Sequence, residues 1–568
     1  MVSTVTLGSG PNYPACLQQI LQSNGSLEGT VDANGHPTTN ISEIYGLTYD
    51  RCISDCGHGP VGFDWQTFSQ QFTSWLLPWL ALISQLPYGS RDALSNCLAV
   101  LLTVGSPTLA AYSLALSVIS NRWMVKQFGR SKYPNRRLAA QTLSNLQQVS
   151  LELPDEEHVL PSLIVIQRNR QWWQTLAHGL DYAVPKWTLA SIMSVVYVGL
   201  ADLFTWINTL GGPLPNVVVN ATGESISSLW LCFLPIVIGN LQLSPKTDSN
   251  RIRRAFDHAN HHFFVATDEG PPEQAHRSSL INIRSESQDT IDEDELSSAP
   301  VYFYARAFTW IRVVRKVADG FDAASQHAFD HHSSGIPPSK REAVVRYCKS
   351  DVQTTSTHSY DFFSIFVRSA LLALFLQWGT TGAAIMAMFL TPTKGQLIPL
   401  TVYCHSYGSH LGLGCRSASY LLYGMNSTLI WILCVLSSVL SHYYKAGKKG
   451  TATSTCIWGA SLVLRLTAKC VAAVNAVWLF LTAIFQFSNL YDNCWCNSSK
   501  LALRSKAYTV ISYSDPVLNS IKLAWAGGMV MALFTAALFL IALNVLRKRP
   551  AKEPESIPLQ WMGPDDDL

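Results

Sequence analysis

Long uncharged apolar stretches constrain the fold of this 568-residue chain more than any other feature. A transmembrane helix needs about 20 mostly apolar residues, because the hydrocarbon core of a bilayer is about 30 Å thick. Only 14% of the residues are charged, whereas a soluble domain usually carries about 25%. The sequence therefore predicts an all-α, polytopic transmembrane helix bundle of about seven spans plus an interfacial helix. Seven windows meet the length requirement: roughly 95–119, 187–209, 227–243, 369–390, 421–441, 467–487 and 524–546.

Two of the apolar segments are ambiguous. The window 227–243 is short and contains Pro235, so it is the weakest of the seven. An eighth segment, 67–86, carries glutamines and has Pro78 near its middle. We interpret it as a Trp-rich helix that lies in the membrane interface, or dips in and returns, with a bend at Pro78. The alternative is an eighth span, which would place the N-terminus in the cytosol.

The positions of lysine and arginine predict the orientation. Basic residues gather after the first window, at the start of the 244–368 loop, after the fifth window and directly after the last one. These segments should be cytosolic, and the segments between them luminal or extracellular. The domains predicted on this basis are a luminal head at 1–66, a membrane region at 67–243 with a cytosolic loop at 120–186, a cytosolic loop with an amphipathic helix at 244–368, a second membrane region at 369–546 and a disordered cytosolic tail at 547–568.

Many of the cysteines and most of the glycosylation sequons lie in the segments expected outside the cytosol, where both are typical. The sequon at Asn426 falls inside a span and should not be modified. Cys348 belongs to the large cytosolic loop and should be free. The connectivity of the others cannot be deduced from sequence. The disulfide candidates are Cys16, Cys52, Cys56, Cys404, Cys415, Cys494 and Cys496, and the glycosylation candidates are Asn24, Asn40, Asn220 and Asn497.

The 244–368 loop combines a polar stretch with an amphipathic one. Residues 268–299 contain two prolines and an acidic run, which is typical of disorder. The following stretch predicts a helix that lies on anionic lipid, packs under the bundle, or belongs to a small cytosolic domain. Its apolar face comprises Phe303, Ala307, Trp310, Ile311, Val314, Val317 and Phe321. Its basic residues Arg306, Arg312, Arg315 and Lys316 should point away from that face.

Clustered histidines raise the question of a metal site. The spacings HxxHH and HxxxHH resemble the histidine boxes of membrane-bound di-iron oxygenases, and imidazole is a common metal ligand. The third pair, His405 and His410, falls in a luminal loop, so it cannot share a metal with the cytosolic groups. We therefore do not expect a di-iron oxygenase, although zinc or another divalent ion remains an alternative to plain polar loops. The cytosolic candidates are His258, His261, His262, His327, His331 and His332.

One carboxylate interrupts a predicted span. Asp202 lies inside 187–209, and an intramembrane carboxylate is costly and often functional. Its expected partners are Arg465 or Lys469, although Lys469 can also reach the cytosolic interface. The sequence favours either a proton or ion site or a polar contact between helices.

Two segments resemble a known group. SWLLPWLALISQLPYG (74–89) and GLGCRSASYLLYG (412–424) are similar to segments of an uncharacterised group of multi-pass membrane proteins of filamentous fungi. The resemblance implies a fungal source and a single membrane-embedded unit, but no activity.

No complete catalytic set or cofactor motif is present, and no basic block indicates nucleic acid. We expect a non-enzymatic accessory, scaffold or sensing protein without a cofactor, in the plasma membrane or secretory pathway. Its partners would be the lipid bilayer and another membrane or cytosolic protein. A transporter or receptor-like protein, and a metal-dependent membrane enzyme that uses the histidines, are the alternatives.

Overall fold

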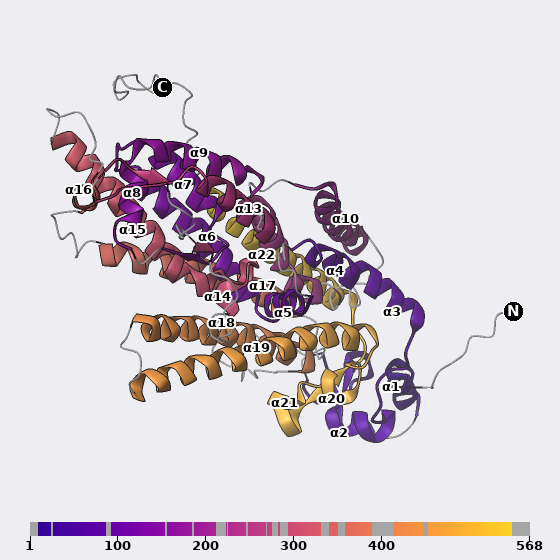
Figure 1. The fold of residues 1–568 in the computed structure, drawn as a ribbon. Coiled ribbons are helices and arrows are strands. Elements are labelled where there is room, and N and C mark those ends of the chain that lie inside the picture. The colour runs from indigo at the N-terminus through magenta and orange to yellow at the C-terminus, as the bar shows by residue number, and fades with distance from the viewer. Residues whose placement is uncertain are drawn as a thin grey trace.

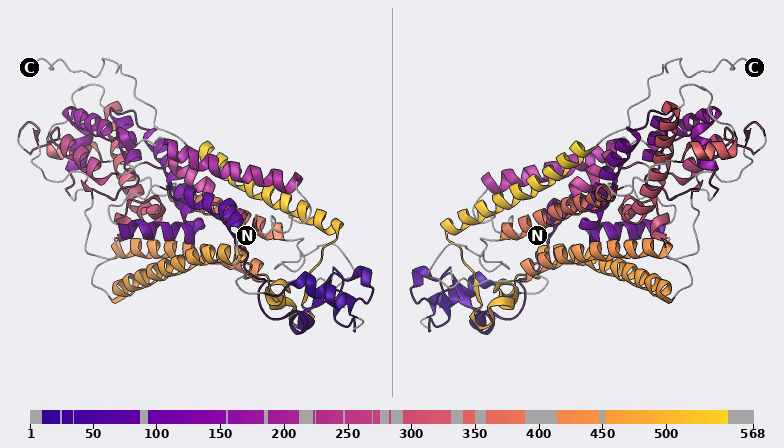
Figure 2. Two further views of the ribbon diagram at one scale, coloured as in Figure 1. Left: turned by 90° about the vertical axis from the view of Figure 1, so that its right-hand side faces the viewer. Right: turned by 90° about the vertical axis from the view of Figure 1, so that its left-hand side faces the viewer.

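The computed structural model is an elongated, almost entirely helical molecule with a bundle between two end domains (Figure 1). A small domain containing α1 and α2 lies at one end, and a cluster of helices containing α7, α8 and α9 lies at the other (Figure 2). The structure describes residues 10–23, 26–33, 35–86, 93–153, 156–183, 187–211, 223, 225–245, 248–268, 270–274, 282–283, 293–330, 340–349, 358–388, 414–446 and 452–547.

The predicted all-α membrane bundle is confirmed. Six described helices are long and apolar enough to cross a bilayer, and a bent pair brings the number to seven. The window 227–243, weak by composition, is the most enclosed of them, since 78% of its apolar window is buried. The helices are α10 (Leu189–Gly211), Ser225–Leu243 with α12 (Phe233–Leu243), α17 (His358–Met388), α18 (Cys415–Ala446), α19 (Ala452–Phe487) and α22 (Asp515–Leu546).

The first predicted span is not one straight helix. It divides into α5 (Ala93–Gly105) and α6 (Pro107–Phe128), which meet at an angle of 101°. The local sequence explains the break. Ser106 caps α6 by accepting a hydrogen bond from the Leu109 amide at 3.2 Å, and Pro107 occupies the first helical position. Gly105 lies so close to α19 that a Cβ there would be 2.0 Å from the Ala472 carbonyl oxygen.

Polar side chains of α18 and α19 satisfy the backbone at this break. Asn475 donates to the Gly105 carbonyl at 2.7 Å, and the Tyr423 hydroxyl donates to the Val104 carbonyl at 2.7 Å. Ser427 lies 2.9 Å from the Thr108 hydroxyl. A break inside a bundle is stable only if its freed backbone groups find such partners.

The segment expected in the interface forms α3 (Trp65–Gln71), a π-helical turn at Phe72–Leu76 and α4 (Leu77–Ile83). It is not among the described helices that meet the length and hydropathy of a span. The π turn precedes Pro78 and accommodates the missing amide donor. Trp75 and Trp79 are buried against the bundle, while Leu80 stays exposed.

The small end domain, here called the head, joins an N-terminal segment to the segment that follows α19. An antiparallel sheet has the order β1 (Thr30–Val31), β2 (Gly46–Thr48) and β7 (Tyr508–Val510). The adjoining helices are α1 (Tyr13–Gln22), α2 (Tyr49–Arg51), the turn Cys52–Cys56, α20 (Cys494–Asn497) and α21 (Lys500–Leu503). The head predicted at 1–66 is therefore completed by the segment that follows α19.

The two predicted cytosolic loops together form the opposite domain, here called the basal domain. Its helices are α7 (Arg136–Asn145), α8 (Val159–Val165), α9 (Arg170–Gly179), α13 (Ser249–Asn260), α15 (Phe303–Asp330) and α16 (Arg341–Tyr347). Two short antiparallel pairs accompany them, β3 (Leu151–Glu152) with β6 (Asn282–Ile283) and β4 (Phe264–Val265) with β5 (Glu273–Gln274).

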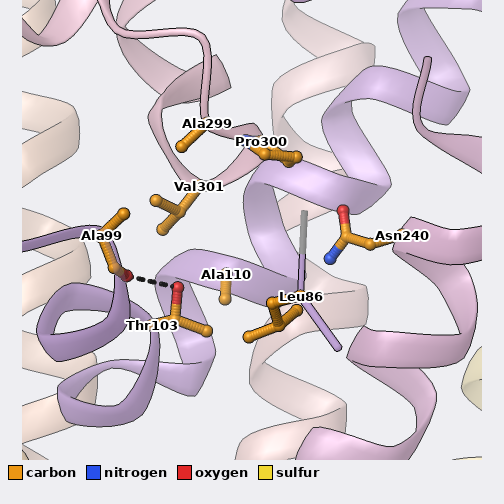
Figure 3. A pocket seen from close by; sticks show the side chains of 8 residues that line it. All are labelled: Leu86, Ala99, Thr103, Ala110, Asn240, Ala299, Pro300 and Val301. Atoms are coloured by element: carbon orange, nitrogen blue, oxygen red, sulfur yellow. Dashed lines mark hydrogen bonds between the residues drawn. The ribbon is translucent and has the colours of Figure 1, made fainter. Parts of the chain in front are cut away.

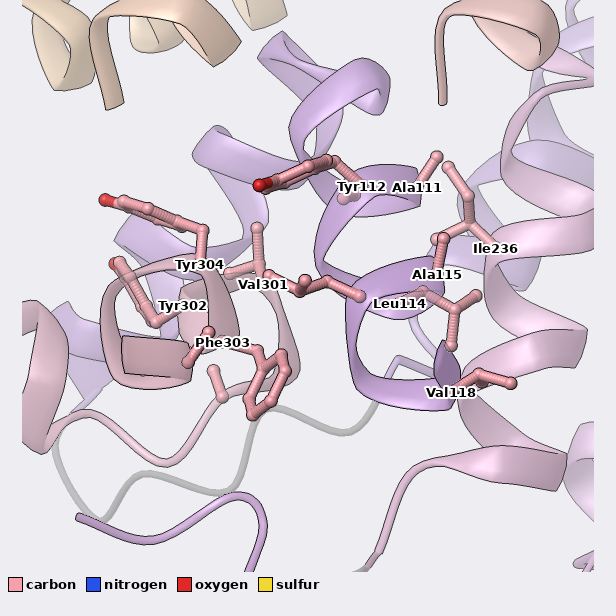
Figure 4. Packing of buried hydrophobic residues seen from close by; sticks show 14 of the residues in the cluster. Ala111, Tyr112, Leu114, Ala115, Val118, Ile236, Val301, Tyr302, Phe303 and Tyr304 are labelled. Carbon is pink, nitrogen blue, oxygen red and sulfur yellow. The ribbon is translucent and has the colours of Figure 1, made fainter. Parts of the chain in front are cut away.

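The amphipathic helix is the centre of the basal domain, not a helix lying on lipid. Phe303, Trp310 and Phe321 are buried in the main hydrophobic core. Figure 4 shows residues 301–304 on one side of α6 and Ile236 of α12 on the other. The Ser113 hydroxyl of α6 donates to the Val301 carbonyl at 2.7 Å. The start of α15 is thus fixed to the bundle.

Candidate functional site

A buried ion cluster joins the basal domain to the membrane bundle. Its acid is Asp294, in the short helix α14 (Glu293–Leu296) just before α15. Lys469 Nζ of α19 lies 2.7 Å from Asp294 Oδ1, and Arg465 Nε lies 3.4 Å from Oδ2. The Tyr304 hydroxyl of α15 donates to Oδ2 at 2.8 Å. Because the Asp294 side chain is only 1% exposed, this carboxylate bridges two parts of the protein out of contact with water.

The cluster keeps Asp294 ionised. Burial alone would raise the pKa of this carboxyl, but the charges of Arg465 and Lys469 and the Tyr304 hydroxyl outweigh it, so the pKa lies below its ordinary value. Glu295 is the neighbouring acid, and its Oε1 accepts from the Thr309 hydroxyl at 2.6 Å. The arrangement is therefore a charged anchor between the α14–α15 segment and α19.

A third cation lies in the same region. Arg306 of α15 is 1% exposed, so the expectation that it points away from the apolar face is wrong. Its Nη2 donates to Gln148 Oε1 at 2.6 Å and to the Ala299 carbonyl at 3.0 Å. Burial lowers the pKa of Arg306 to about 9, although Glu295 and Asp294 act in the opposite direction. Arg312, Arg315 and Lys316 are exposed as expected, so Arg306 is the one of the four basic residues that neighbouring elements cover.

A second polar anchor lies where α18 begins, next to the head. Arg416 is fully buried, and its guanidinium donates to Gln486 Oε1 at 2.5 Å and Asn497 Oδ1 at 3.1 Å. Its Nη2 also pairs with Asp492 at 3.0 Å. The α18–α19 hairpin is consequently anchored at two places, by Arg416 next to the head and by Asp294 of the basal domain.

The disulfides connect the head to the same hairpin. They are Cys16–Cys56, Cys52–Cys494 and Cys415–Cys496, so six of the seven candidate cysteines are paired. Cys404 lies outside the described residues. Cys348 is free. Cys415–Cys496 joins the start of α18 to the segment after α19, and Cys52–Cys494 joins that segment to the N-terminal part of the head.

The partner expected for Asp202 is wrong, because Arg465 and Lys469 both pair with Asp294. Asp202 is half-buried on α10, on the stripe that also carries the buried Val198 and Thr205. Within the described residues it has no hydrogen bond or ion pair. It is therefore separate from the ion cluster.

The histidine groups do not form a metal centre within the part of the chain that the structure describes. No group of three or more His, Cys, Asp or Glu side chains there could hold an ion. His258 and His262 lie with ring centroids 6.1 Å apart at the end of α13, and His261 is exposed. His327 Nε2 lies 3.4 Å from the Lys349 carbonyl. His331, His332, His405 and His410 lie outside the described residues.

The sequons differ in accessibility. Asn40 is exposed at the start of a short 3₁₀ turn. Asn497 is only 8% exposed and accepts a hydrogen bond from Arg416, so the folded structure disagrees with a glycan at this position. Asn426 contacts Asn475 inside α18, as expected for an unmodified residue in a span. Asn24 and Asn220 lie outside the described residues.

Sequence reasoning missed Asp294 and the role of Arg465. The acidic run was interpreted as part of a disordered stretch, but Asp294 and Glu295 are buried, so that interpretation is wrong for residues 293–299. A signal was present: Arg465 and Lys469 are four residues apart at one end of an apolar window, hence on one helix face. Two basic residues there favour an acidic partner, and the run that ends in Asp294 and Glu295 is a dense source of carboxylates.

No family model, curated protein or solved structure matches this chain.

Proposed function

We propose that the protein is a non-enzymatic membrane scaffold with a receptor-like sensing role, which couples its head to its basal domain. The observation that supports this proposal is the double anchoring of the α18–α19 hairpin. Cys415–Cys496 and Arg416 join the hairpin to the head, and Asp294 joins it to the basal domain. A displacement of the head would therefore move one packed element that contacts the basal ion cluster through Arg465 and Lys469 of α19.

The proposed location is the plasma membrane or the secretory pathway, with the head outside the cytosol. Three disulfides in and around the head suit an oxidising compartment. Arg122 and Lys126 near the end of α6, and the exposed Arg312 of α15, lie on the basal side, as the rule for cytosolic loops predicts.

Hydrogen exchange of the full-length protein in nanodiscs tests the coupling. Replacing Cys415 and Cys496 by serine should speed amide exchange in α14 and in the first turns of α15, because the hairpin loses the covalent one of its two anchors at the head. The matched control replaces Cys16 and Cys56, whose disulfide lies entirely within the head. That control should alter exchange only in the head. If both double variants change the head alone, the two ends are not coupled.

A transporter is the second candidate, and the broken helix favours it. Transporter sites are often built from discontinuous helices near the bilayer centre. Here Thr108, Gln377 and Ser427 from α6, α17 and α18 converge at the break, and the Ser427 hydroxyl donates to Gln377 Oε1 at 2.9 Å. A transporter should expose this position alternately to both sides.

Labelling of Ser427→Cys with a membrane-impermeant thiol reagent tests that alternative, with the unsubstituted protein as the background control. Labelling from both faces of sealed vesicles would favour transport. Protection from both faces would indicate that these polar contacts only stabilise the bundle. Asp202→Asn adds a second test: loss of flux with normal assembly would mark a coupling site, and loss of thermal stability a contact between helices.

A further inference from the structure

Asn240 of α12 carries a buried hydrogen-bond acceptor that no described residue satisfies. The residue lies in the most enclosed of the described candidate spans and is only 6% exposed. Its Nδ2 donates to the Ile236 carbonyl, one turn earlier, at 2.9 Å. Its Oδ1 receives no hydrogen bond from the described part of the chain. An amide oxygen that stays unpaired away from water is costly, so Asn240 Oδ1 needs a donor.

A cavity adjoins this acceptor. It has a volume of about 20 Å³ and lies where α5, α6 and α12 meet the turn Pro300–Tyr302 that precedes α15. Figure 3 shows Asn240 reaching from α12 toward Leu86, Ala110 and Pro300. A space of this size holds roughly one water molecule, whereas sites for small organic ligands are far larger.

The lining decides whether such a cavity is wet or dry. Six of its eight residues are apolar, and a purely apolar cavity stays empty. The other two are Asn240 and Thr103, which come from different helices. The Thr103 hydroxyl donates to the Ala99 carbonyl at 2.7 Å, so its oxygen keeps a lone pair for another donor. Two acceptors in one small space favour a molecule that can donate twice.

We propose that this cavity binds an ordered water molecule, which donates to Asn240 Oδ1 and to the Thr103 hydroxyl oxygen. The water allows a polar residue to lie inside an enclosed span, because it satisfies an amide oxygen that lipid and apolar side chains cannot. The site also depends on the docking of the basal domain. Ala299, Pro300 and Val301 close one side of the cavity, so the water is enclosed only while the start of α15 is docked. This inference is independent of the proposed sensing function.

Hydroxyl-radical footprinting of the full-length protein in nanodiscs tests the site, because X-ray pulses generate radicals from water that is bound inside a protein. Val301 lines the cavity and is 6% exposed, whereas Val104 does not line it and is 8% exposed. Because the two side chains have the same chemistry and similar exposure, water in the cavity should make Val301 oxidise several-fold faster than Val104. Equally slow oxidation of both valines would show a dry cavity and overturn the proposal.

Variants assign the effect to Asn240. Asn240→Leu should slow the oxidation of Val301 to the rate of Val104, because it removes the acceptor and fills part of the cavity. The matched control is Asn544→Leu on α22. Asn544 also bonds the carbonyl four residues earlier at 2.9 Å, but it is exposed, so this change should leave the oxidation of Val301 unaltered.

A second variant covers the case in which Asn240→Leu does not fold. Ala110→Val fills the cavity with Asn240 still in place, and it should slow the oxidation of Val301 to the same extent. Fast oxidation of Val301 in either variant would show that the radicals come from elsewhere, and the proposal would fail. Equal slowing by Asn544→Leu would show a change of the whole bundle and would also overturn it.

Discussion

Asp294→Asn should detach the basal domain from the membrane bundle. The substitution keeps the size of the side chain but removes the negative charge that faces Lys469 at 2.7 Å and Arg465 at 3.4 Å. Arg465 and Lys469 then lose the carboxylate that both contact. Because Asp294 is buried, water cannot replace the lost charge without opening the interface.

The expected magnitude follows from the burial of the pair. Removing one partner of a buried ion pair typically costs about 3–5 kcal/mol, which raises the population of the open state by about 150-fold to several thousand-fold. The matched control is Asp268→Asn. This change breaks a 3.5 Å ion pair between Asp268, whose side chain is 68% exposed, and Arg341. Such exposed pairs contribute at most about 1 kcal/mol, so this change should be nearly neutral.

Limited proteolysis and amide exchange of α14 and α15 measure the opening directly. A double-mutant cycle with Lys469→Met should give a coupling energy above about 1 kcal/mol, because the two side chains interact within one network. An Asp294→Asn protein as resistant to protease as the Asp268→Asn control would refute the reasoning. The buried carboxylate would then contribute nothing to docking.

Three further outcomes are expected. Gly105→Ala should destabilise the bundle strongly, since its Cβ would overlap the Ala472 carbonyl of α19, whereas Gly199→Ala on α10 meets nothing within 4 Å and should be neutral or slightly stabilising in thermal unfolding. Asn40→Gln should increase gel mobility by one glycan, while Asn497→Gln should leave mobility unchanged and lower stability; a mobility shift for Asn497 would contradict the buried position. Because the pKa of Asp294 is lowered on folding, its contribution should be complete above the unfolded pKa of about 3.9 and lost as pH falls through the folded value. Protease resistance of the basal domain should therefore hold from neutral pH to about pH 4 and decline below it, and Asp294→Asn should remove this acid transition.

Hydropathy predicted the membrane helices because a bilayer requires a long apolar run whatever the tertiary structure. It did not predict how the first run is divided, although Gly105, Ser106 and Pro107 together are a typical helix stop and start. The average hydropathy of a window does not detect a helix boundary encoded by three adjacent residues. The bend of 101° also depends on Asn475 and Tyr423, which are more than 300 residues away in sequence.

The ion cluster was harder to predict, because its acid lies in a polar, acidic segment whereas its two bases lie near the start of an apolar one. Acidic runs usually stay in water, and only the tertiary contact with α19 makes Asp294 a buried residue. The predicted pairing of Asp202 with Arg465 or Lys469 was reasonable by hydropathy, since Asp202 lies in one apolar window and the two basic residues lie near the start of another. Periodicity likewise divides α15 into two faces, but it cannot show that other elements cover both, as they do at Arg306.

The Cys52–Cys494 bond joins residues 442 positions apart, so it can form only late in the synthesis of the chain. At translation rates of about 5–20 residues per second, Cys52 leaves the ribosome roughly 20–90 seconds before its partner exists. The sheet that holds the head together must wait as well, because β7 pairs with β2 only after residue 510 has been made. During this interval Cys16, Cys52 and Cys56 are close together in sequence in an incomplete domain. Cys52 can then form a non-native disulfide with Cys16 or Cys56 before Cys494 has been made. The nascent head therefore depends on thiol exchange, or on protection of Cys52, until synthesis is almost finished.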